Sequence, residues 1–257
     1  MGFFSSLLDL FFNSPERVGE KGENLTASKL EWINLWGYKG MLLQNVYIPK
    51  SNGETTEIDL LYITEKGIFV IESKNYSGYI FGNEQYKSWT ASLYGGKTWY
   101  GVKTSHKYKF YNPVWQNRTH IKYLRKYLEA WDIPMFSLIV FSDRCELKAI
   151  TIVSDNVFVC KRYNMNEYIK SVWENSEMCI KEETIVDIYN KLKLLTVENA
   201  ALKEKHVQTI NEKLLNPVKC PCCGGNLVLR TARQGSHAGE QFYGCSNYPK
   251  CRYIKNM

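Results

Sequence analysis

The sequence predicts an α/β fold with a mixed central sheet flanked by helices, followed by a small cysteine-rich module. Strand-like apolar runs alternate with segments of helical spacing, and residues 136–141 (F-S-L-I-V-F) are continuously apolar, as expected of a strand buried on both faces. Five of the eight cysteines lie after residue 219. With 257 residues, of which 44% are hydrophobic, the chain can build one large and one small domain.

Four parts are expected along the chain: an apolar N-terminal segment at residues 1–15, a main domain at 16–180, a helical connector at 181–216 and a cysteine module at 217–257. The N-terminal segment is too short to span a bilayer and lacks the basic start of a signal peptide. A docked amphipathic helix is favoured there, and contact with a membrane surface is the alternative.

The main domain is expected to begin with a helix. Ser14-Pro15 is a helix-start signal, and the helix continues to about Trp36. One face of this helix carries apolar and polar residues together, at Leu25, Ser28 or Lys29, Trp32, and Leu35 or Trp36. Residues 40–48 then read as a strand that Pro49 ends.

The stretch 56–74 reads as a β-hairpin, because two apolar runs flank the turn signal Glu65-Lys66-Gly67. Asp59 lies within the first run, and Glu72 and Lys74 lie within the second. Buried charge is costly unless a partner or a metal compensates it. The hairpin therefore predicts a metal site with a cation beside it.

The register of this hairpin decides whether the charges meet. Glu72 and Lys74 share a face because side chains alternate along a strand. A two-residue loop places Asp59 opposite Lys74, a four-residue loop places it opposite Glu72, and a plain three-residue loop separates the two carboxylates. The alternative is an edge hairpin whose solvated polar face includes Glu57, Asp59 and Glu72.

Residues 75–104 are rich in aromatic residues and glycine, which favours short strands and turns. Interleaved lysines suit base stacking and phosphate contact; they are Lys87, Lys97, Lys103, Lys107 and Lys109. An ordinary antiparallel extension with exposed lysines is the alternative.

The rest of the main domain and the connector alternate between helix and strand. A basic helix is expected from Asn112-Pro113 to about Trp131, a strand at 157–160 and a helix at 165–173. A long connector helix is expected over 182–215.

The C-terminal cysteines form two pairs, Cys220 with Cys223 and Cys245 with Cys251. Four thiolates in two such pairs suit a tetrahedral, structural Zn²⁺ that supplies folding energy to a small module. Cys222 is the odd thiol, and reduced free thiols are the alternative. Clustered cysteines favour a metal over disulfides, and so a reducing, cytoplasmic setting. Two strands are expected at 227–229 and 241–243.

The charge balance is compatible with a polyanionic partner but does not require one: the net charge is +7 and the pI is near 8.8.

The stretch from Lys219 to Tyr253, which includes G-C-S-N-Y-P-K-C, resembles the zinc ribbon at the C-terminus of bacterial type I DNA topoisomerases. That resemblance implies binding of single-stranded DNA. It implies stacking by Phe242, Tyr243 or Tyr248 and phosphate contacts by Arg230, Arg233, Lys250 or Arg252.

The main domain resembles the nuclease-related domain, a branch of the PD-(D/E)xK restriction-endonuclease-like fold. The matching motifs are Gly19-x-x-Gly22-Glu23, Glu57-Ile58-Asp59, Glu72-Ser73-Lys74 and Asn112-Pro113-x-x-Gln116. The sequence departs from the parent nuclease pattern at Ile58, where that pattern has proline.

This resemblance implies that Asp59 and Glu72 hold Mg²⁺ or Mn²⁺ through hard oxygen ligands. Lys74 would orient a water or stabilise charge at phosphorus, and Glu23 would complete the metal shell or accept a proton. Gln116 would support the site or touch the scissile phosphate. An inert salt bridge from Lys74 to Glu72 or Asp59 is the alternative.

The expected function is a metal-dependent DNA nuclease, a phosphodiesterase, with a DNA-binding tail that prefers single strands. The alternative is a catalytically weak or inactive DNA-binding protein that recruits partners through the same fold. No small-molecule substrate is expected, and the oligomeric state is left open.

Overall fold

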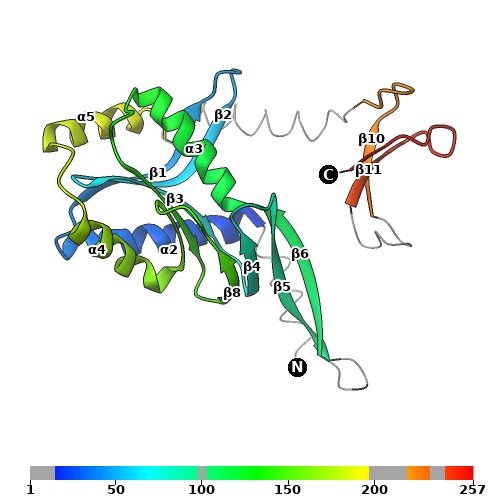
Figure 1. Cartoon of the computed structure of the whole chain (residues 1–257), viewed down its shortest axis with the longest axis horizontal. Helices are drawn as coiled ribbons and strands as arrows, with labels where there is room; N and C mark the ends of the chain where they lie inside the picture. The colour runs from blue at the N-terminus through cyan, green and yellow to red at the C-terminus, as the bar shows by residue number, and fades with distance from the viewer. Residues whose placement is uncertain (1–14, 98–99, 101–102, 197–218, 232–240, 257) are drawn as a thin grey trace. The chain divides into compact units, whose positions relative to one another are not determined.

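The computed structural model describes residues 15–97, 100, 103–196, 219–231 and 241–256. The chain divides into two compact units, residues 1–203 and 204–257, and each is described by itself (Figure 1). The expected N-terminal helix and the second half of the connector lie outside the described residues. None of the described helices is long and apolar enough to cross a membrane.

A five-stranded mixed sheet forms the centre of the first unit, with the strand order β1-β2-β3-β7-β9. Its strands are β1 (Gly40–Pro49), β2 (Thr55–Thr64), β3 (Gly67–Lys74), β7 (Met135–Phe141) and β9 (Val157–Lys161). The first three pair antiparallel, and β3, β7 and β9 pair parallel. The predicted mixed α/β architecture is therefore confirmed.

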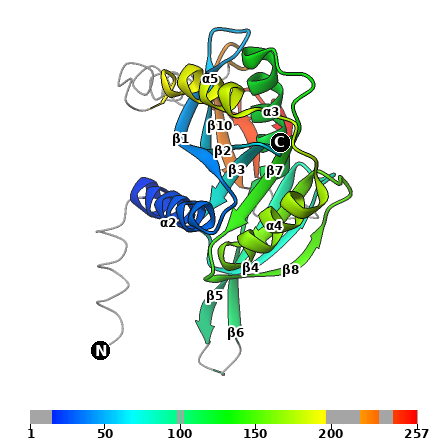
Figure 2. The same ribbon diagram turned by 90° about the vertical axis from the view of Figure 1, so that its left-hand side faces the viewer.

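Helices cover both faces of this sheet (Figures 1 and 2). They are α2 (Pro15–Leu35) and α4 (Met165–Asn175) on one face, and α3 (Pro113–Leu128) and α5 (Glu182–Lys193) on the other. The short 3-10 helix η1 (Arg162–Asn164) leads into α4. On the α2 side, Leu30 and Ile33 pack with Phe69 of β3. On the α3 side, Leu124 packs with Val70 and with Ile188 of α5.

The buried face of α2 differs from the mixed stripe suggested by the sequence. Ala27, Leu30 and Ile33 are buried against the sheet, whereas Trp32 and Trp36 are exposed. Neighbouring residues of a helix differ by about 100° in direction, so two stripes that are offset by two residues face nearly opposite sides. The sheet selects the stripe of smaller residues.

Both ends of α3 are set by local chemistry. The Asn112 side chain accepts a hydrogen bond from the Val114 N–H, and Pro113 follows as the first helical residue. The helix ends at Leu128 because Glu129 adopts a left-handed conformation, earlier than the predicted Trp131. Helix α5 ends at Lys193, so the helix expected over residues 182–215 does not run on through residues 194–196.

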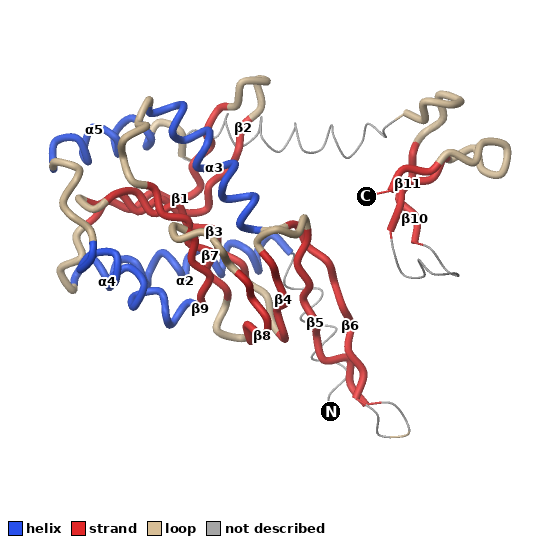
Figure 3. Tube along the Cα trace, viewed as in Figure 1, coloured by secondary structure: helices blue, strands red, loops and turns tan. Residues whose placement is uncertain are grey.

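A second, four-stranded sheet has the order β6-β5-β4-β8 (Figure 3). Its strands are β4 (Gly78–Asn83), β5 (Ser88–Lys97), β6 (Lys103–Tyr111) and β8 (Cys145–Thr151). One face packs on α3 and β7, where Trp89 stacks on Phe141 with ring centroids 6.1 Å apart. The sequence predicted short strands between 75 and 104 but not β8.

The second unit contains a three-stranded ribbon of β10 (Leu227–Thr231), β11 (Gln241–Cys245) and β12 (Ile254–Asn256). All its pairings are antiparallel. The first two strands match the prediction, and β12 was not predicted.

Candidate active site and zinc site

The β2–β3 hairpin brings the predicted charges together. Its pairing includes Leu60 with Ile71 and Thr64 with Gly67, so continuing the register by one residue sets Asp59 opposite Glu72. This is the register predicted for a four-residue loop. Thr64 and Gly67 also pair, so only two residues, Glu65 and Lys66, remain in the loop. The three-residue alternative, which would separate the carboxylates, is wrong.

Gly67 allows this tight turn. Its φ is +137°, and a Cβ there would lie 2.6 Å from the Pro134 carbonyl oxygen.

Glu72 is almost fully buried, with 1% exposure, and both of its carboxylate oxygens are engaged. Lys74 Nζ donates to Oε1 at 2.5 Å, and His120 Nε2 lies 3.3 Å from Oε2. Asp59 is half-buried and accepts a hydrogen bond from the Ser73 backbone N–H at 2.8 Å. The structure thus contains the Lys74–Glu72 ion pair that the sequence offered as an alternative.

Helix α3 supplies the other side of this cluster. Gln116 Oε1 accepts from Lys74 Nζ at 3.2 Å, which places the predicted Gln116 beside the predicted lysine. His120 was not predicted as a site residue. It follows Gln116 by one helical turn, and its Nδ1 lies 2.8 Å from Thr56 Oγ1. That i, i+4 spacing on one helix face was the signal that could have found it.

Glu23 reaches the cluster from α2. Its pKa is raised by burial and by the nearby carboxylates of Glu57 and Glu72. The helix lies close to β3 at this point, because a Cβ on Gly22 would lie only 2.8 Å from Asn75 Cβ. Any larger residue than glycine at position 22 would push Glu23 away from the site.

The carboxylates of the site differ in charge state. Burial, together with Glu72 and Glu23, raises the pKa of Asp59 well above its usual value. Burial also opposes ionisation of Glu72, but Lys74 and His120 outweigh it and lower its pKa. Burial disfavours the Lys74 ammonium, yet Glu72 and Asp59 outweigh burial and raise its pKa. Glu72 is therefore held ionised beside the Lys74 ammonium, whereas Asp59 resists ionisation.

A divalent cation would favour the ionised form of Asp59 and offset the repulsion among the carboxylates, so the donor set fits Mg²⁺ or Mn²⁺. Hard carboxylate oxygens are the ligands that these ions prefer. Asp59 and Glu72 would hold the ion, with Glu23 as a further ligand. Among the described residues, these acids do not form a group of three converging ligand atoms.

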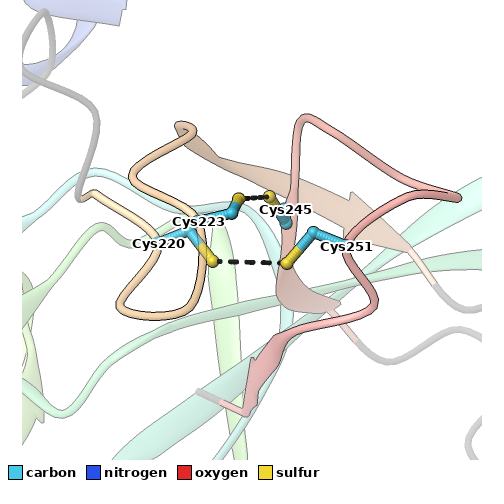
Figure 4. A group of neighbouring side chains, drawn as sticks. All are labelled: Cys220, Cys223, Cys245 and Cys251. Carbon is cyan, nitrogen blue, oxygen red and sulfur yellow. Dashed lines mark hydrogen bonds between the residues drawn. The ribbon is translucent and has the colours of Figure 1, made fainter.

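The four predicted cysteines form a zinc-ribbon site (Figure 4). Their sulfur atoms all lie within 4.8 Å of one another; the residues are Cys220, Cys223, Cys245 and Cys251. The Cys220–Cys251 and Cys223–Cys245 sulfur distances are 3.7 and 3.4 Å. Tetrahedral zinc with Zn–S bonds of about 2.3 Å requires roughly 3.8 Å between sulfurs, so the thiols fit structural Zn²⁺.

Backbone N–H groups turn toward the ribbon sulfurs. The Asn247 N–H donates to Cys245 Sγ at 3.4 Å. Hydrogen bonds from the Gly225 backbone and from the Cys245 thiol lower the pKa of Cys223 to about 7. The Cys223 thiolate, the form that zinc needs, is thus favoured, whereas the proton shared with Cys223 raises the pKa of Cys245. Cys222 is exposed and stands outside the four-cysteine group.

Some of the ribbon residues that were predicted to contact nucleic acid are exposed. Tyr248 is 61% exposed, Lys250 and Arg252 are exposed, and the Arg230 guanidinium lies 5.9 Å from the Tyr248 ring centroid. Tyr243 packs against the ribbon core and Phe242 is half-buried, so both are less available for stacking. Arg233 lies outside the described residues.

Comparison with known proteins identifies both parts of the chain. Residues 18–142 match the nuclease-related domain, and residues 217–257 match the topoisomerase DNA binding C4 zinc finger. An uncharacterized protein of Bacillus anthracis is 28% identical over 199 residues, covering 77% of this chain and 86% of that protein. No solved structure matches the chain significantly.

The topoisomerase relatives are much longer than this chain. DNA topoisomerase 1 of Helicobacter pylori (strain J99) is 44% identical over 140 residues, which are 54% of this chain but 16% of that enzyme. DNA topoisomerase 1 of Archaeoglobus fulgidus is 54% identical over 35 residues, 14% of this chain and 5% of that enzyme. The chain therefore carries a nuclease-related domain followed by a topoisomerase-type C4 zinc ribbon.

Proposed function

We propose that the protein is a metal-dependent DNA nuclease that hydrolyses phosphodiester bonds and binds single-stranded DNA through its zinc ribbon. One observation carries the proposal: Asp59, Glu72 and Lys74 converge at the end of the β2–β3 hairpin. The match to a nuclease-related domain supports it. The free cysteines in the described residues fit a reducing compartment, which we take to be the cytoplasm.

Each residue of the site would have its own role in hydrolysis. Asp59 and Glu72 would hold Mg²⁺ or Mn²⁺, and Glu23 would complete the shell. Bound metal supplies Lewis acidity at the phosphate and lowers the pKa of a coordinated water. Lys74 keeps its proton because its pKa is raised, so its ammonium can stabilise charge on the phosphate. Gln116 holds the Lys74 side chain in place.

The buried second layer keeps Glu72 pointed into the site. Thr56 holds His120 at 2.8 Å, and His120 in turn contacts Glu72. Such supporting hydrogen bonds fix the orientation of metal-binding side chains.

The test is cleavage of plasmid and single-stranded DNA with Mg²⁺ or Mn²⁺ by the wild type and by Glu72→Gln or Asp59→Asn. Loss of a metal ligand should reduce cleavage by at least roughly 100-fold, while DNA affinity stays within about twofold, because the basic surface is unchanged. Glu183→Gln, at an exposed acid of α5, is the matched control. Full cleavage by both site variants would refute the assignment.

The second candidate function is a weak or inactive DNA-binding protein that recruits partners. The 2.5 Å Lys74–Glu72 pair favours it, because this lysine already neutralises one of the two carboxylates. Wild-type protein that binds DNA but shows no cleavage with either metal would select this alternative.

A further inference from the structure

The sheet formed by β6, β5, β4 and β8 has one buried and one open face. Ile80, Trp89 and Ala91 point into the core. Side chains alternate along strands, so their neighbours point the opposite way. We call that opposite side the outer face. Its aromatic and basic residues are Tyr79, Phe81, Lys107, Lys109, Tyr111 and the bulge residue Lys148.

Aromatic rings are exposed across this outer face. Tyr79 and Phe81 of β4 are 47% and 38% exposed, and Tyr111 of β6 is 49% exposed. The register places Tyr79 beside Ser92 and Phe81 beside Thr90, so small side chains of β5 separate the β4 rings from β6. Exposed rings next to small polar residues offer aromatic surface to a planar ligand.

Lysines lie on both sides of these rings. Lys107 and Lys109 of β6 pair with Ser92 and Thr90 and are exposed. On the other edge, Lys148 Nζ lies 5.1 Å from the Tyr79 ring centroid. The segment that forms β5 and β6 is also basic, because residues 87–111 include five lysines and no acidic residue.

One acid lies on the same face, and it is already paired. The β4–β8 register sets Glu146 beside Tyr79, and its Oε1 accepts from Lys161 Nζ at 3.0 Å. It therefore does not cancel the charge of the three outer-face lysines.

We propose that this outer face binds single-stranded nucleic acid, with bases stacked on Tyr79 and Phe81 and phosphates held by the flanking lysines. The charge selects a polyanion, and the rings select unpaired bases, because bases within a duplex already stack on one another. The site is separate from the carboxylate cluster and the zinc ribbon, so the proposal does not depend on DNA cleavage. Strand β4 begins four residues after Lys74, so the proposed binding face follows the nuclease motif along the chain.

The first test uses the full chain and a labelled oligothymidylate of about 16 nucleotides. Anisotropy is measured at moderate salt without added Mg²⁺. The double variant Tyr79→Ala, Phe81→Ala should bind at least about 30-fold more weakly, since each lost stack is worth about 1–3 kcal/mol. Tyr79→Phe, Phe81→Tyr should restore binding because the rings are kept.

Matched controls separate stacking from general surface effects. Trp131→Ala removes an exposed aromatic elsewhere and should bind as the wild type does. The melting temperature and the zinc content of every variant are measured, so that a folding defect is recognised. Affinity of Tyr79→Ala, Phe81→Ala within twofold of the wild type would overturn the proposal.

The lysines are tested through salt dependence. Lys107→Gln, Lys109→Gln should reduce the slope of log affinity against log salt by about 1.4, roughly 0.7 for each lost phosphate contact on a single strand. Lys122→Gln, Lys170→Gln removes two exposed lysines away from this face and should leave the slope unchanged. An unchanged salt slope in Lys107→Gln, Lys109→Gln would show that these two lysines do not contact phosphates.

Cross-linking locates the strand directly. An oligonucleotide carrying 5-iododeoxyuridine should cross-link on irradiation to the peptide that contains Tyr79 and Phe81, in addition to any ribbon peptide. Cross-links in the ribbon alone would overturn the proposal. So would a change in sedimentation coefficient of the ring variants without loss of binding, which would make the face a contact between copies of the chain.

Discussion

The two candidate metal sites hold their ligands in opposite ways. The four cysteine sulfurs face one another within 4.8 Å and come from two short turns of one small unit. The carboxylates come from β2, β3 and α2, and Glu72 is already bound to Lys74 and His120. The difference teaches that the thiol site is assembled by short local turns, whereas the acidic site depends on the packing of a strand hairpin and two helices around a buried ion pair.

The largest expected effect tests the thiol site. Cys245→Ser should lose zinc and unfold the ribbon, because metal binding supplies about 10–16 kcal/mol to such modules. Cys222→Ser is the matched control and should keep one zinc per chain, since Cys222 lies outside the four-ligand group. Metal analysis and limited proteolysis measure both. Zinc loss from Cys222→Ser with retention in Cys245→Ser would mean that the thiols are paired differently.

A smaller effect separates binding from cleavage. Removing the ribbon by ending the chain after Leu215 should weaken binding to single-stranded DNA by at least roughly tenfold, which needs only about 1.4 kcal/mol. Stacking by Tyr248 and charge from Lys250 and Arg252 would supply this. The shortened protein should still cut at high DNA concentration, since the proposed catalytic residues all lie before residue 117.

Equal single-strand affinity of the full and shortened chains, measured by anisotropy at moderate salt, would remove the ribbon from DNA binding. Tyr248→Ala in the full chain refines the test, with the exposed Trp131→Ala as its control. A loss in the first variant alone would identify Tyr248 as a stacking residue.

The thiol site could be predicted from the sequence because its determinants are local. A C-x-x-C pair and a C-x5-C pair each place two sulfurs on one turn, so the spacing alone defines the ligands. The acidic site was harder, because its geometry depends on hairpin register. The sequence allowed three loop lengths, and only the pairing of Thr64 with Gly67 selects among them.

What the sequence missed depends on tertiary packing. His120 looked like one polar residue of a basic helix until α3 packed over β3 and set it against Glu72. The buried stripe of α2 was missed for the same reason, since two helix faces were apolar and only the sheet chooses between them. Strand β8 carries exposed polar residues on an edge, and so it lacks the apolar pattern that reveals a strand.

The smallest expected effect distinguishes the two carboxylates of the acidic site. The pKa of Asp59 is raised, so protonated Asp59 stabilises the fold below its unfolded pKa of about 3.9, and that stabilisation is lost as pH rises through the folded pKa. The pKa of Glu72 is lowered, so its ionised form stabilises the fold above an unfolded pKa of about 4.3. That contribution is lost as pH falls through the folded pKa.

Asp59→Asn should therefore raise the melting temperature of the metal-free protein at pH 8, by roughly 2–4 °C if about 1 kcal/mol is recovered. The amide can still accept the Ser73 N–H, and the gain should shrink as the pH is lowered and Asp59 takes up its proton. Glu72→Gln should lower the melting temperature at pH 8, because it leaves Lys74 without its buried partner. Added Mg²⁺ should stabilise the wild type more at pH 8 than at pH 5, since protons compete with the cation for these oxygens. A lower melting temperature for Asp59→Asn at pH 8 would show that the ionised Asp59 carboxylate stabilises the fold, and the site would then be an ion-pair network instead of a place prepared for a metal.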